Sequence, residues 1–307
     1  MYVTLTLNPS LDVVYSVPEV RPGRLHRSET QTVRPGGKGV NVAIMARRLG
    51  AEVRALGFSA GVTGTALAGL LEEEGITAEF QRLERGLTRV NAKVLAAETT
   101  QFNGPGPEVH EAALDGLVGQ LAGLGPDDTL VVAGAPPAGD AVLERILQVV
   151  AGGPRLVVDV PDPWLRPLLA YHPWLIKPNR SELGRTLGPR ATGPDTLEIA
   201  VGQAREVQGL TGGWVVVSLG GSGALAVGPD GAVITATPPP GVARNPVGAG
   251  DALLAGYLVA WDRWGDPQTA LAWGVAAGTA TTYHGWLAPA EAVAALVRAV
   301  QLTDHVH

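Results

Sequence analysis

Short apolar runs alternate with longer amphipathic segments along most of the chain. Continuous apolar runs predict strands that are buried on both faces, since helices then cover both sides of a parallel sheet; these runs are residues 129–133, 156–160, 174–176 and 214–219. Residues 53–58 predict a further strand, and helices are predicted at 63–74, 141–150 and 197–207. This alternation predicts an α/β fold with a mostly parallel central sheet flanked by helices.

Two segments break the pattern because they are rich in β-forming residues but more polar. They are residues 12–33 and 88–102, and each adjoins a candidate site. We expect them to form a small separate sheet that covers the site as a lid. Residues 229–231 separate two short strand patterns and predict a hairpin, and the chain after residue 249 is mostly helical. We therefore expect residues 1–307 to form a single domain with a β-lid.

Composition and charge limit the partners of the protein. The chain has 307 residues, of which 46% are hydrophobic and 17% charged, which is typical of a folded globular protein. A net charge of −6 gives no general basic surface for nucleic acid. No cysteine is present, which excludes disulfides, thiolate nucleophiles and cysteine-bound zinc. No apolar run approaches the roughly 18 residues of a membrane span, and no signal peptide is evident, so we expect a cytoplasmic protein without membrane contact.

The strongest chemical signal is the run Gly248-Ala249-Gly250-Asp251 before a predicted helix at 252–261. The glycines open the N-terminus of this helix, where unpaired N–H groups and the helix dipole attract anions. A carboxylate in the first turn can accept a proton from an attacking hydroxyl. An ordinary glycine-rich helix start is the alternative interpretation.

A second glycine-rich run, Gly36-Gly37-Lys38-Gly39, precedes another helical pattern that contains Asn41. Glycine lets the backbone approach a ligand closely, while lysine supplies charge. The run is not a Walker A loop, because Gly39 follows the lysine where Ser or Thr is required. A flexible turn is the alternative, but the density of glycine with Lys38 and Asn41 favours a ligand site.

Strand alternation at residues 88–94 places Arg89, Asn91 and Lys93 on one face. Such a face is cationic and rich in hydrogen-bond donors, and arginine is well suited to phosphate. The alternative is an ordinary solvated strand face.

Two further segments follow predicted strands. Lys177, Asn179 and Glu182 come after the strand at 174–176, where an amide and a carboxylate suit a hydrated Mg²⁺; a helix-capping box is the alternative, and both interpretations are compatible. The run from Ser218 to Gly223 follows the next strand and suits the phosphates or ribose of a nucleotide, although glycine-rich strand exits are common.

In this order along the chain, these segments resemble the PfkB (ribokinase-like) sugar kinases. The opening Asn8-Pro9-Ser10-Leu11-Asp12 and the run from Gly36 to Asn41 look like the 1-phosphofructokinase and tagatose-6-phosphate kinase branch. The similarity covers residues 5 to about 285. It implies a three-layer ribokinase-like fold with a small β-lid, the cofactors ATP and Mg²⁺, and a homodimer formed through the lid.

The resemblance also implies roles for individual residues. Asp251 matches the catalytic base, and an anion hole is formed by Gly248, Ala249 and Gly250. The sugar phosphate is expected to contact Asp12, Arg24, Gly37, Lys38, Asn41 and Arg89. Glu182 is expected to organise Mg²⁺ through water, with Asn179 as the other residue of the motif. The nucleotide is expected to contact Lys177, Asn179, Ser218, Gly220, Gly223, Ala277 and Gly278.

The implied reaction is ATP-dependent phosphorylation of fructose 1-phosphate to fructose 1,6-bisphosphate. Tagatose 6-phosphate is the second expected substrate and fructose 6-phosphate the third. A non-catalytic sugar-phosphate sensor on the same fold remains an alternative. A serine hydrolase is disfavoured: Gly57-Phe58-Ser59-Ala60-Gly61 fits a nucleophile elbow but leaves the other segments unexplained.

The sequence departs from the family pattern in two places. Asn245 and Pro246 stand where relatives often have an acidic or hydroxyl residue and then threonine, which questions a nearby monovalent-cation site. The run Tyr283-His284-Gly285 also differs from the pattern expected at the end of the adenine region.

Overall fold

The computed structural model describes residues 1–136, 140–188 and 196–305. Within these ranges the strands form a ten-stranded sheet and a separate four-stranded sheet. The large sheet has the order β14-β13-β12-β11-β10-β9-β8-β1-β4-β5. Its strands are β1 (Tyr2–Thr6), β4 (Val53–Ala60), β5 (Thr77–Leu83), β8 (Thr129–Ala133), β9 (Arg155–Asp159), β10 (Leu175–Ile176), β11 (Trp214–Ser218), β12 (Ala224–Val227), β13 (Val233–Thr237) and β14 (Gln301–Asp304).

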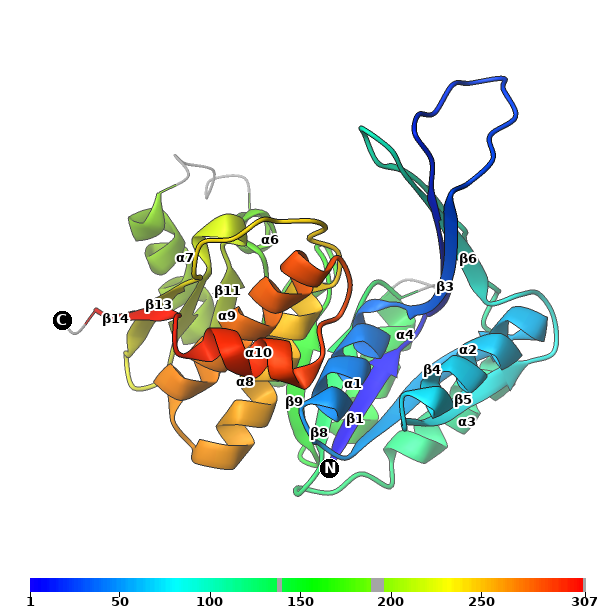
Figure 1. Cartoon of the computed structure of the whole chain (residues 1–307). Helices are drawn as coiled ribbons and strands as arrows, with labels where there is room; N and C mark the ends of the chain where they lie inside the picture. The colour runs from blue at the N-terminus through cyan, green and yellow to red at the C-terminus, as the bar shows by residue number, and fades with distance from the viewer. Residues whose placement is uncertain (137–139, 189–195, 306–307) are drawn as a thin grey trace.

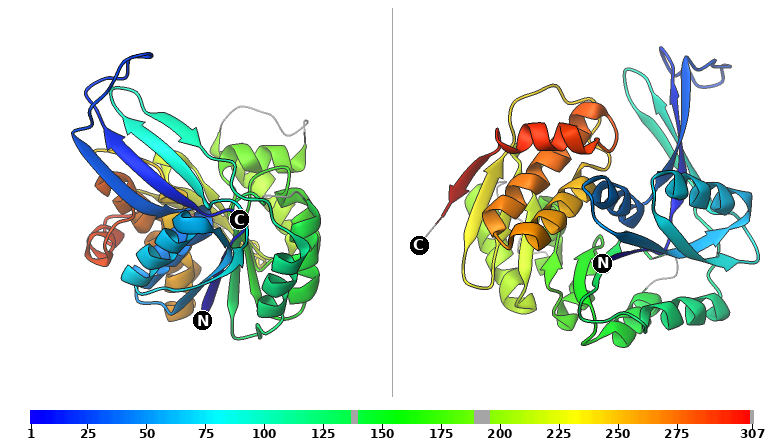
Figure 2. Two further views of the ribbon diagram at one scale, coloured as in Figure 1. Left: turned by 90° about the vertical axis from the view of Figure 1, so that its right-hand side faces the viewer. Right: turned by 60° about the horizontal axis from the view of Figure 1, so that its bottom comes forward.

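The strands from β5 to β11 run parallel, and β12, β13 and β14 continue the sheet antiparallel at one edge. Helices cover both faces (Figures 1 and 2). One face packs against α1 (Lys38–Arg48), α2 (Gly61–Glu73), α8 (Ala249–Trp264), α9 (Pro267–His284) and α10 (Ala290–Val297). The other packs against α3 (Glu111–Leu121), α4 (Asp140–Val150), α5 (Leu165–Leu168), α6 (Arg180–Leu187) and α7 (Leu197–Thr211).

Alternating side chains of the central strands supply two separate hydrophobic cores. On β8, Leu130 and Val132 belong to the core under α3 and α4, whereas Val131 and Ala133 belong to the core under α1 and α8. Every residue of β8 is buried, which explains why the sequence shows a continuous apolar run there. The predicted α/β class with a mostly parallel sheet between two helical layers is confirmed.

The second sheet is formed by β2 (Ser10–Ser16), β3 (Thr30–Gly36), β6 (Arg89–Leu95) and β7 (Thr100–Asn103), in the order β3-β2-β6-β7. It projects from the body, with the loop between β2 and β3 at its far end (Figure 1). These strands come from the two polar segments that predicted a separate small sheet. Across the described residues, no helix combines the length and apolar character needed to cross a membrane.

Candidate active site

The N-terminus of α8 forms the centre of the candidate site. Gly248 is the N-cap with φ 82°, and no side chain caps the helix. The N–H of Ala249 donates to the carbonyl of Pro246 at 3.1 Å, so the turn itself uses this predicted donor. The N–H groups of Gly250 and Asp251 follow, and the hydrogen-bond pattern of a helix provides no partner for them. This end of α8 therefore presents donors and a positive dipole to an anion.

Asp251 lies in this first turn and is buried. Its Oδ2 accepts a hydrogen bond of 2.7 Å from Nδ2 of Asn41, which belongs to α1. Burial and the nearby charge of Asp159 raise the pKa of Asp251 to about 6, against the opposing effects of Asn41, Lys38 and Lys177. A carboxylate whose pKa lies near the working pH is well matched to the role of a general base.

Asp159 was missed in the sequence, although it holds the charged groups of the site together. It ends β9 and is 1% exposed. Its Oδ1 lies 2.9 Å from Nζ of Lys38, and its Oδ2 lies 3.2 Å from Nζ of Lys177. Burial alone would raise the pKa of Asp159, but both ammonium groups outweigh it and the pKa is lowered. The sequence feature that could have identified Asp159 is a carboxylate at the end of a predicted apolar strand.

Lys38 and Lys177 both lie beside the N-terminus of α8. Burial alone would lower the pKa of Lys38, but Asp159, Asp251 and Glu182 outweigh it, so the pKa lies above its ordinary value. Nζ of Lys177 lies close to Gly250, since a Cβ added there would be 3.4 Å from it. The observed partner of Lys38 is thus Asp159 near the anion-binding turn, rather than a group on the second sheet.

The second sheet turns a polar face inward around Asp12. This carboxylate accepts hydrogen bonds from Ser10 Oγ at 2.8 Å and Asn91 Nδ2 at 2.8 Å, and from Lys93 Nζ at 2.5 Å. Asn91 and Lys93 are buried, so the alternation predicted for β6 is present and its polar face is the covered one. Gly36 is required beside this group, because an added Cβ would lie 2.6 Å from Asp12 Oδ1.

Arg89 and Arg24 occupy different environments. Arg89 is half-buried, its Nε donates to the Asn8 carbonyl at 3.1 Å, and burial lowers its pKa although Asp12 opposes this. Arg24 is exposed in the loop between β2 and β3. A single chain therefore brings Arg89, but not Arg24, to the other predicted contacts. Gly37 adopts φ 115° as the N-cap of α1 and packs against Thr6 and Pro9.

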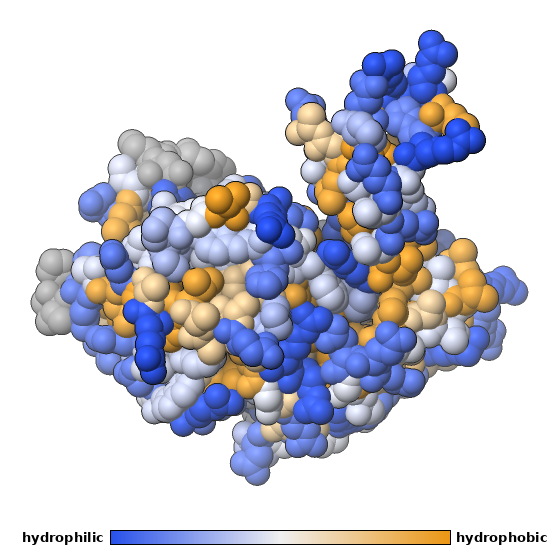
Figure 3. All heavy atoms as spheres, in the orientation of Figure 1, coloured by the Kyte–Doolittle hydropathy of each residue, from blue (hydrophilic) through white to orange (hydrophobic). Residues whose placement is uncertain are grey.

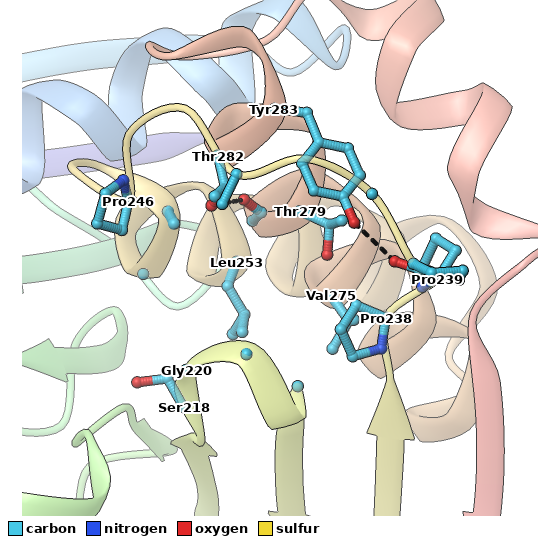
Figure 4. Close-up of a pocket in the computed structure, with 18 residues that line it drawn as sticks. Ser218, Gly220, Pro238, Pro239, Pro246, Leu253, Val275, Thr279, Thr282 and Tyr283 are labelled. Atoms are coloured by element: carbon cyan, nitrogen blue, oxygen red, sulfur yellow. Dashed lines mark hydrogen bonds between the residues drawn. The ribbon is translucent and has the colours of Figure 1, made fainter.

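A cavity of about 520 Å³ lies between the β11–β12 turn and helices α8 and α9 (Figure 4). Predicted residues on its wall are Ser218, Gly220, Gly223 and Gly278. Ala249 and Gly250 also line it, so the cavity reaches the anion-binding turn. Ala277 is not on this wall; it is fully buried, and its Cβ would lie 2.9 Å from a Cβ added at Gly256.

Sequence reasoning missed the proline-rich wall of this cavity, Pro238-Pro239-Pro240-Gly241. Tyr283 of α9 donates a hydrogen bond from its hydroxyl to the Pro239 carbonyl at 2.7 Å (Figure 4). Its ring packs so closely on Gly241 that an added Cβ would lie 2.3 Å away. The proline run was the available signal, since it restricts the backbone in an extended conformation.

Asn179 and Glu182 form the predicted capping box of α6. Asn179 Oδ1 accepts from the Glu182 N–H at 2.9 Å, and Glu182 Oε2 accepts from the Asn179 N–H at 2.9 Å. The described part of the chain holds no group of three or more His, Cys, Asp or Glu side chains suited to a metal. A magnesium role for Glu182 stays a prediction, and it requires water and phosphate oxygens as the remaining ligands.

The departures from the family pattern have local structural roles. Asn245 bridges two segments: its Oδ1 accepts from the Val247 N–H at 3.0 Å, and its Nδ2 donates to the Gly285 carbonyl at 3.2 Å. The hydrolase alternative finds no support, because a nucleophile elbow places its serine in the turn after a strand, whereas Ser59 lies within β4.

Known proteins resemble this chain over nearly its whole length. Residues 6–291 match the model of the pfkB family of carbohydrate kinases. The chain is 33% identical to a 1-phosphofructokinase of Bacillus subtilis, with 99% of both chains covered. It is 29% identical to a D-tagatose-1-phosphate kinase of Bacillus licheniformis, again over 99% of both chains.

Among solved structures, the fold matches phosphofructokinase-2 from Escherichia coli in complex with substrates and products. The TM-score is 0.88 at 30% identity, and the match covers 97% of this chain and 98% of the other. The same enzyme has been solved in a tetrameric inhibited form, with 29% identity, a TM-score of 0.88 and the same coverage of both chains.

The protein is therefore a phosphotransferase that acts on an alcohol group of a carbohydrate. The chain belongs to the pfkB family of carbohydrate kinases. The family predicted from the motifs is therefore confirmed.

Replacing Asp251 with Asn should stabilise the protein at neutral pH. The pKa of Asp251 is about 6 in the folded protein against an ordinary 3.8, so folding disfavours the ionised form. Asp251→Asn removes this cost and should raise the free energy of unfolding at pH 7.5 by roughly 2–3 kcal/mol. The gain should shrink as the pH falls below about 6 and vanish below about 4. Urea denaturation at several pH values measures it.

Asp159→Asn is the matched control, with the opposite sign expected. Its pKa is lowered in the folded protein, and the substitution leaves Lys38 and Lys177 without their buried counter-charge. The free energy of unfolding at pH 7.5 should therefore fall. A destabilised Asp251→Asn protein at pH 7.5 would contradict the conclusion that folding disfavours the ionised form of Asp251.

Proposed function

We propose that this protein transfers the γ-phosphate of ATP to the primary hydroxyl of a ketohexose phosphate, with fructose 1-phosphate as the preferred substrate. The single observation that carries the proposal is the position of Asp251. It is a buried carboxylate with a raised pKa in the anion-binding turn of α8. The nucleotide-sized cavity reaches this turn on one side, and Asn41 contacts Asp251 from α1, next to the second sheet.

In this mechanism, Asp251 takes the proton of the substrate hydroxyl as the oxygen attacks the γ-phosphorus and the bond to ADP breaks. Charge on the transferred phosphoryl group is stabilised by the N–H groups of Gly250 and Asp251 and by Lys38 and Lys177. Asn41 holds the Asp251 carboxylate in place through a hydrogen bond of 2.7 Å from its Nδ2 to Asp251 Oδ2. Phosphoryl transfer needs positioning and electrostatic stabilisation more than covalent chemistry, and the site supplies both.

ATP would occupy the cavity beside the β11–β12 turn. The glycines at 220, 221 and 223 allow close approach of phosphates, and the wall formed by the prolines, Val275 and Tyr283 is apolar enough for a base. Glu182 would hold Mg²⁺ through water, since its buried carboxylate lies at the start of α6, close to the charged groups of the site. When bound, the metal would neutralise charge on the phosphates of the nucleotide.

The phosphate already on the substrate would bind to the inner face of the second sheet. Arg89 and Lys93 give this face its positive charge, and Asp12 and Asn91 supply acceptors and donors for sugar hydroxyls. Support for a 1-phosphate comes from the Bacillus subtilis relative, a 1-phosphofructokinase. The tagatose kinase relative supports a tagatose phosphate as second substrate, with the phosphate at position 1 rather than 6.

We further propose that the second sheet is a lid and that it forms a homodimer. Register places Val33, Val13, Ala92 and Phe102 in one row across the four strands, on the face opposite Asp12. Phe102 is 63% exposed and Val33 is 45% exposed. Figure 3 shows apolar surface along the projecting sheet and hydrophilic surface at its tip. An exposed apolar face on a sheet is typical of an interface between copies.

Phe102→Asp should therefore shift the protein from dimer to monomer in sedimentation experiments, because a charge on this face opposes its burial. Leu210→Asp, which changes a leucine on α7 that is 53% exposed, is the control and should leave the mass unchanged. A monomeric wild-type protein would refute the dimer.

The substrate is tested by ADP release with Mg-ATP and a panel of acceptors. The panel contains fructose 1-phosphate, tagatose 1-phosphate, tagatose 6-phosphate, fructose 6-phosphate and unphosphorylated fructose. We expect the highest kcat/KM with fructose 1-phosphate. Tight binding of one sugar phosphate without turnover, in folded protein, would favour the non-catalytic sensor instead.

The pH dependence of turnover tests the role of Asp251. The carboxylate must be ionised to accept a proton, and its pKa is about 6. We expect kcat/KM to be level above pH 7 and to fall as the pH drops through about 6.

Asp251→Asn should lower kcat by roughly 10²–10⁴-fold. Asp159→Asn should move the pH break downward, because the charge of Asp159 raises the pKa of Asp251. Near-normal turnover of Asp251→Asn would refute the base assignment.

A further inference from the structure

Trp286 joins three elements that are far apart in the sequence. It follows Gly285, the C-cap of α9, in the short connection to α10. The guanidinium carbon of Arg34, on β3 of the second sheet, lies 5.0 Å from the centroid of its ring. The guanidinium carbon of Arg48, at the end of α1, lies 4.9 Å from the same ring. Both distances are within the range of cation–π attraction.

Arg48 fixes the ring to the body of the protein. Its Nε donates to Glu74 Oε2 at 2.9 Å, and its Nη1 donates to the carbonyl of Leu287 at 2.6 Å. Arg48 thus binds both the ring of Trp286 and the backbone of the next residue. The connection after α9 is thereby held in one place relative to α1.

Arg34 provides the contact with the second sheet. Arg34 and Asp12 are directly paired in the register of β3 and β2, so both project from the same face. Arg34 is half-buried against Trp286, whereas its strand neighbour Val33 is exposed on the other face. The ring of Trp286 therefore meets the sheet on the face that carries the proposed substrate contacts.

The residue after Trp286 contacts the anion-binding turn. Leu287 is buried, and a Cβ added at Gly248 would lie 3.4 Å from its Cδ2. One residue before Trp286, the carbonyl of Gly285 accepts from Asn245 Nδ2 at 3.2 Å. The connection 285–287 therefore packs on the loop that opens α8, on both sides of the tryptophan.

We propose that Trp286 is a positioning residue that fixes the second sheet relative to the anion-binding turn. Its contact with Arg34 fixes the position of Asp12 and the neighbouring residues of the sheet. The next residue in the chain, Leu287, packs beside Gly248. This inference rests on the kinase activity proposed above. It adds a residue that touches neither substrate yet sets the distance between the two halves of the site. Among the described residues, neither Trp286 nor Arg34 lines the nucleotide cavity.

The kinetic test compares Trp286→Leu, Trp286→Phe and Arg34→Met with the wild type. Loss of the cation–π contact between Arg34 and Trp286 should raise the KM for fructose 1-phosphate roughly three- to tenfold, the range expected for a partly buried contact of this kind. The KM for Mg-ATP should stay unchanged, because the cavity wall does not include these residues. Trp286→Phe should recover most of the loss, since it keeps an aromatic face. Arg34→Met combined with Trp286→Leu should be no worse than the more impaired single variant.

Trp264→Leu is the matched control. Trp264 also lies under an arginine, with Arg263 at 5.2 Å, and stacks on Trp273 at 5.4 Å, but it is at the far end of α8. Its loss should change neither KM. The proposal would be overturned if Trp286→Leu raised the KM for fructose 1-phosphate and the KM for Mg-ATP equally. It would also be overturned if the KM increases of the two single variants multiplied in the double variant.

Hydrogen exchange provides a readout that does not depend on catalysis. In Trp286→Leu, amides of β3 and of residues 285–288 should exchange faster, whereas those of β11 and β12 should not. Trp264→Leu should leave β3 unchanged. If the protein phosphorylates no sugar phosphate, this pattern still tests the link between sheet and turn; unchanged exchange in β3 would refute it whatever the activity.

Discussion

The site depends on one buried carboxylate shared between two lysines. Asp159 ends β9, while Lys38 begins α1 and Lys177 follows β10, so the ion pairs join three elements at the same edge of the sheet. Taking a carboxylate out of water is costly unless it is paired, and here both ammonium groups offset that cost. The arrangement keeps two positive charges beside the first turn of α8, where an incoming phosphoryl group needs them.

The same charges explain why Asp251 differs from Asp159. Both carboxylates are buried, but Asp159 pairs with two lysines, whereas Asp251 has the neutral amide of Asn41 as its hydrogen-bond partner. The pKa of Asp159 is therefore lowered, and that of Asp251 is raised to about 6. Two similar side chains are thus separated into a fixed anion and a group that can exchange a proton. This separation is obtained at the expense of stability at neutral pH.

The second sheet has two chemically different faces because its strands are amphipathic. One face carries Asp12, Asn91 and Lys93 toward the body, and the other carries Val33 and Phe102 toward solvent. A strand alternates with a period of two, so one short segment supplies both a polar lining and an apolar outer surface. The contact of Arg34 with Trp286 belongs to the inner face, which links this sheet to the helical layer.

The sequence by itself determined the α/β layering, the strand at Thr129–Ala133 to the residue, the separate small sheet, the capping box of Asn179 and Glu182, and the family. These features are set by local periodicity, glycine spacing and motif order, which are visible along one dimension. Only the tertiary structure decided that Asp159 is the partner of both lysines, that Ala277 packs against α8 rather than lining the cavity, and that Trp286 meets Arg34. Each of these depends on contacts between residues at least eighteen positions apart. For Asp159 and the two lysines, the connections between parallel strands bring the residues together at the carboxyl ends of those strands. The charge state of Asp251 belongs to the same group, because burial and distant charges, not neighbouring residues, set its pKa.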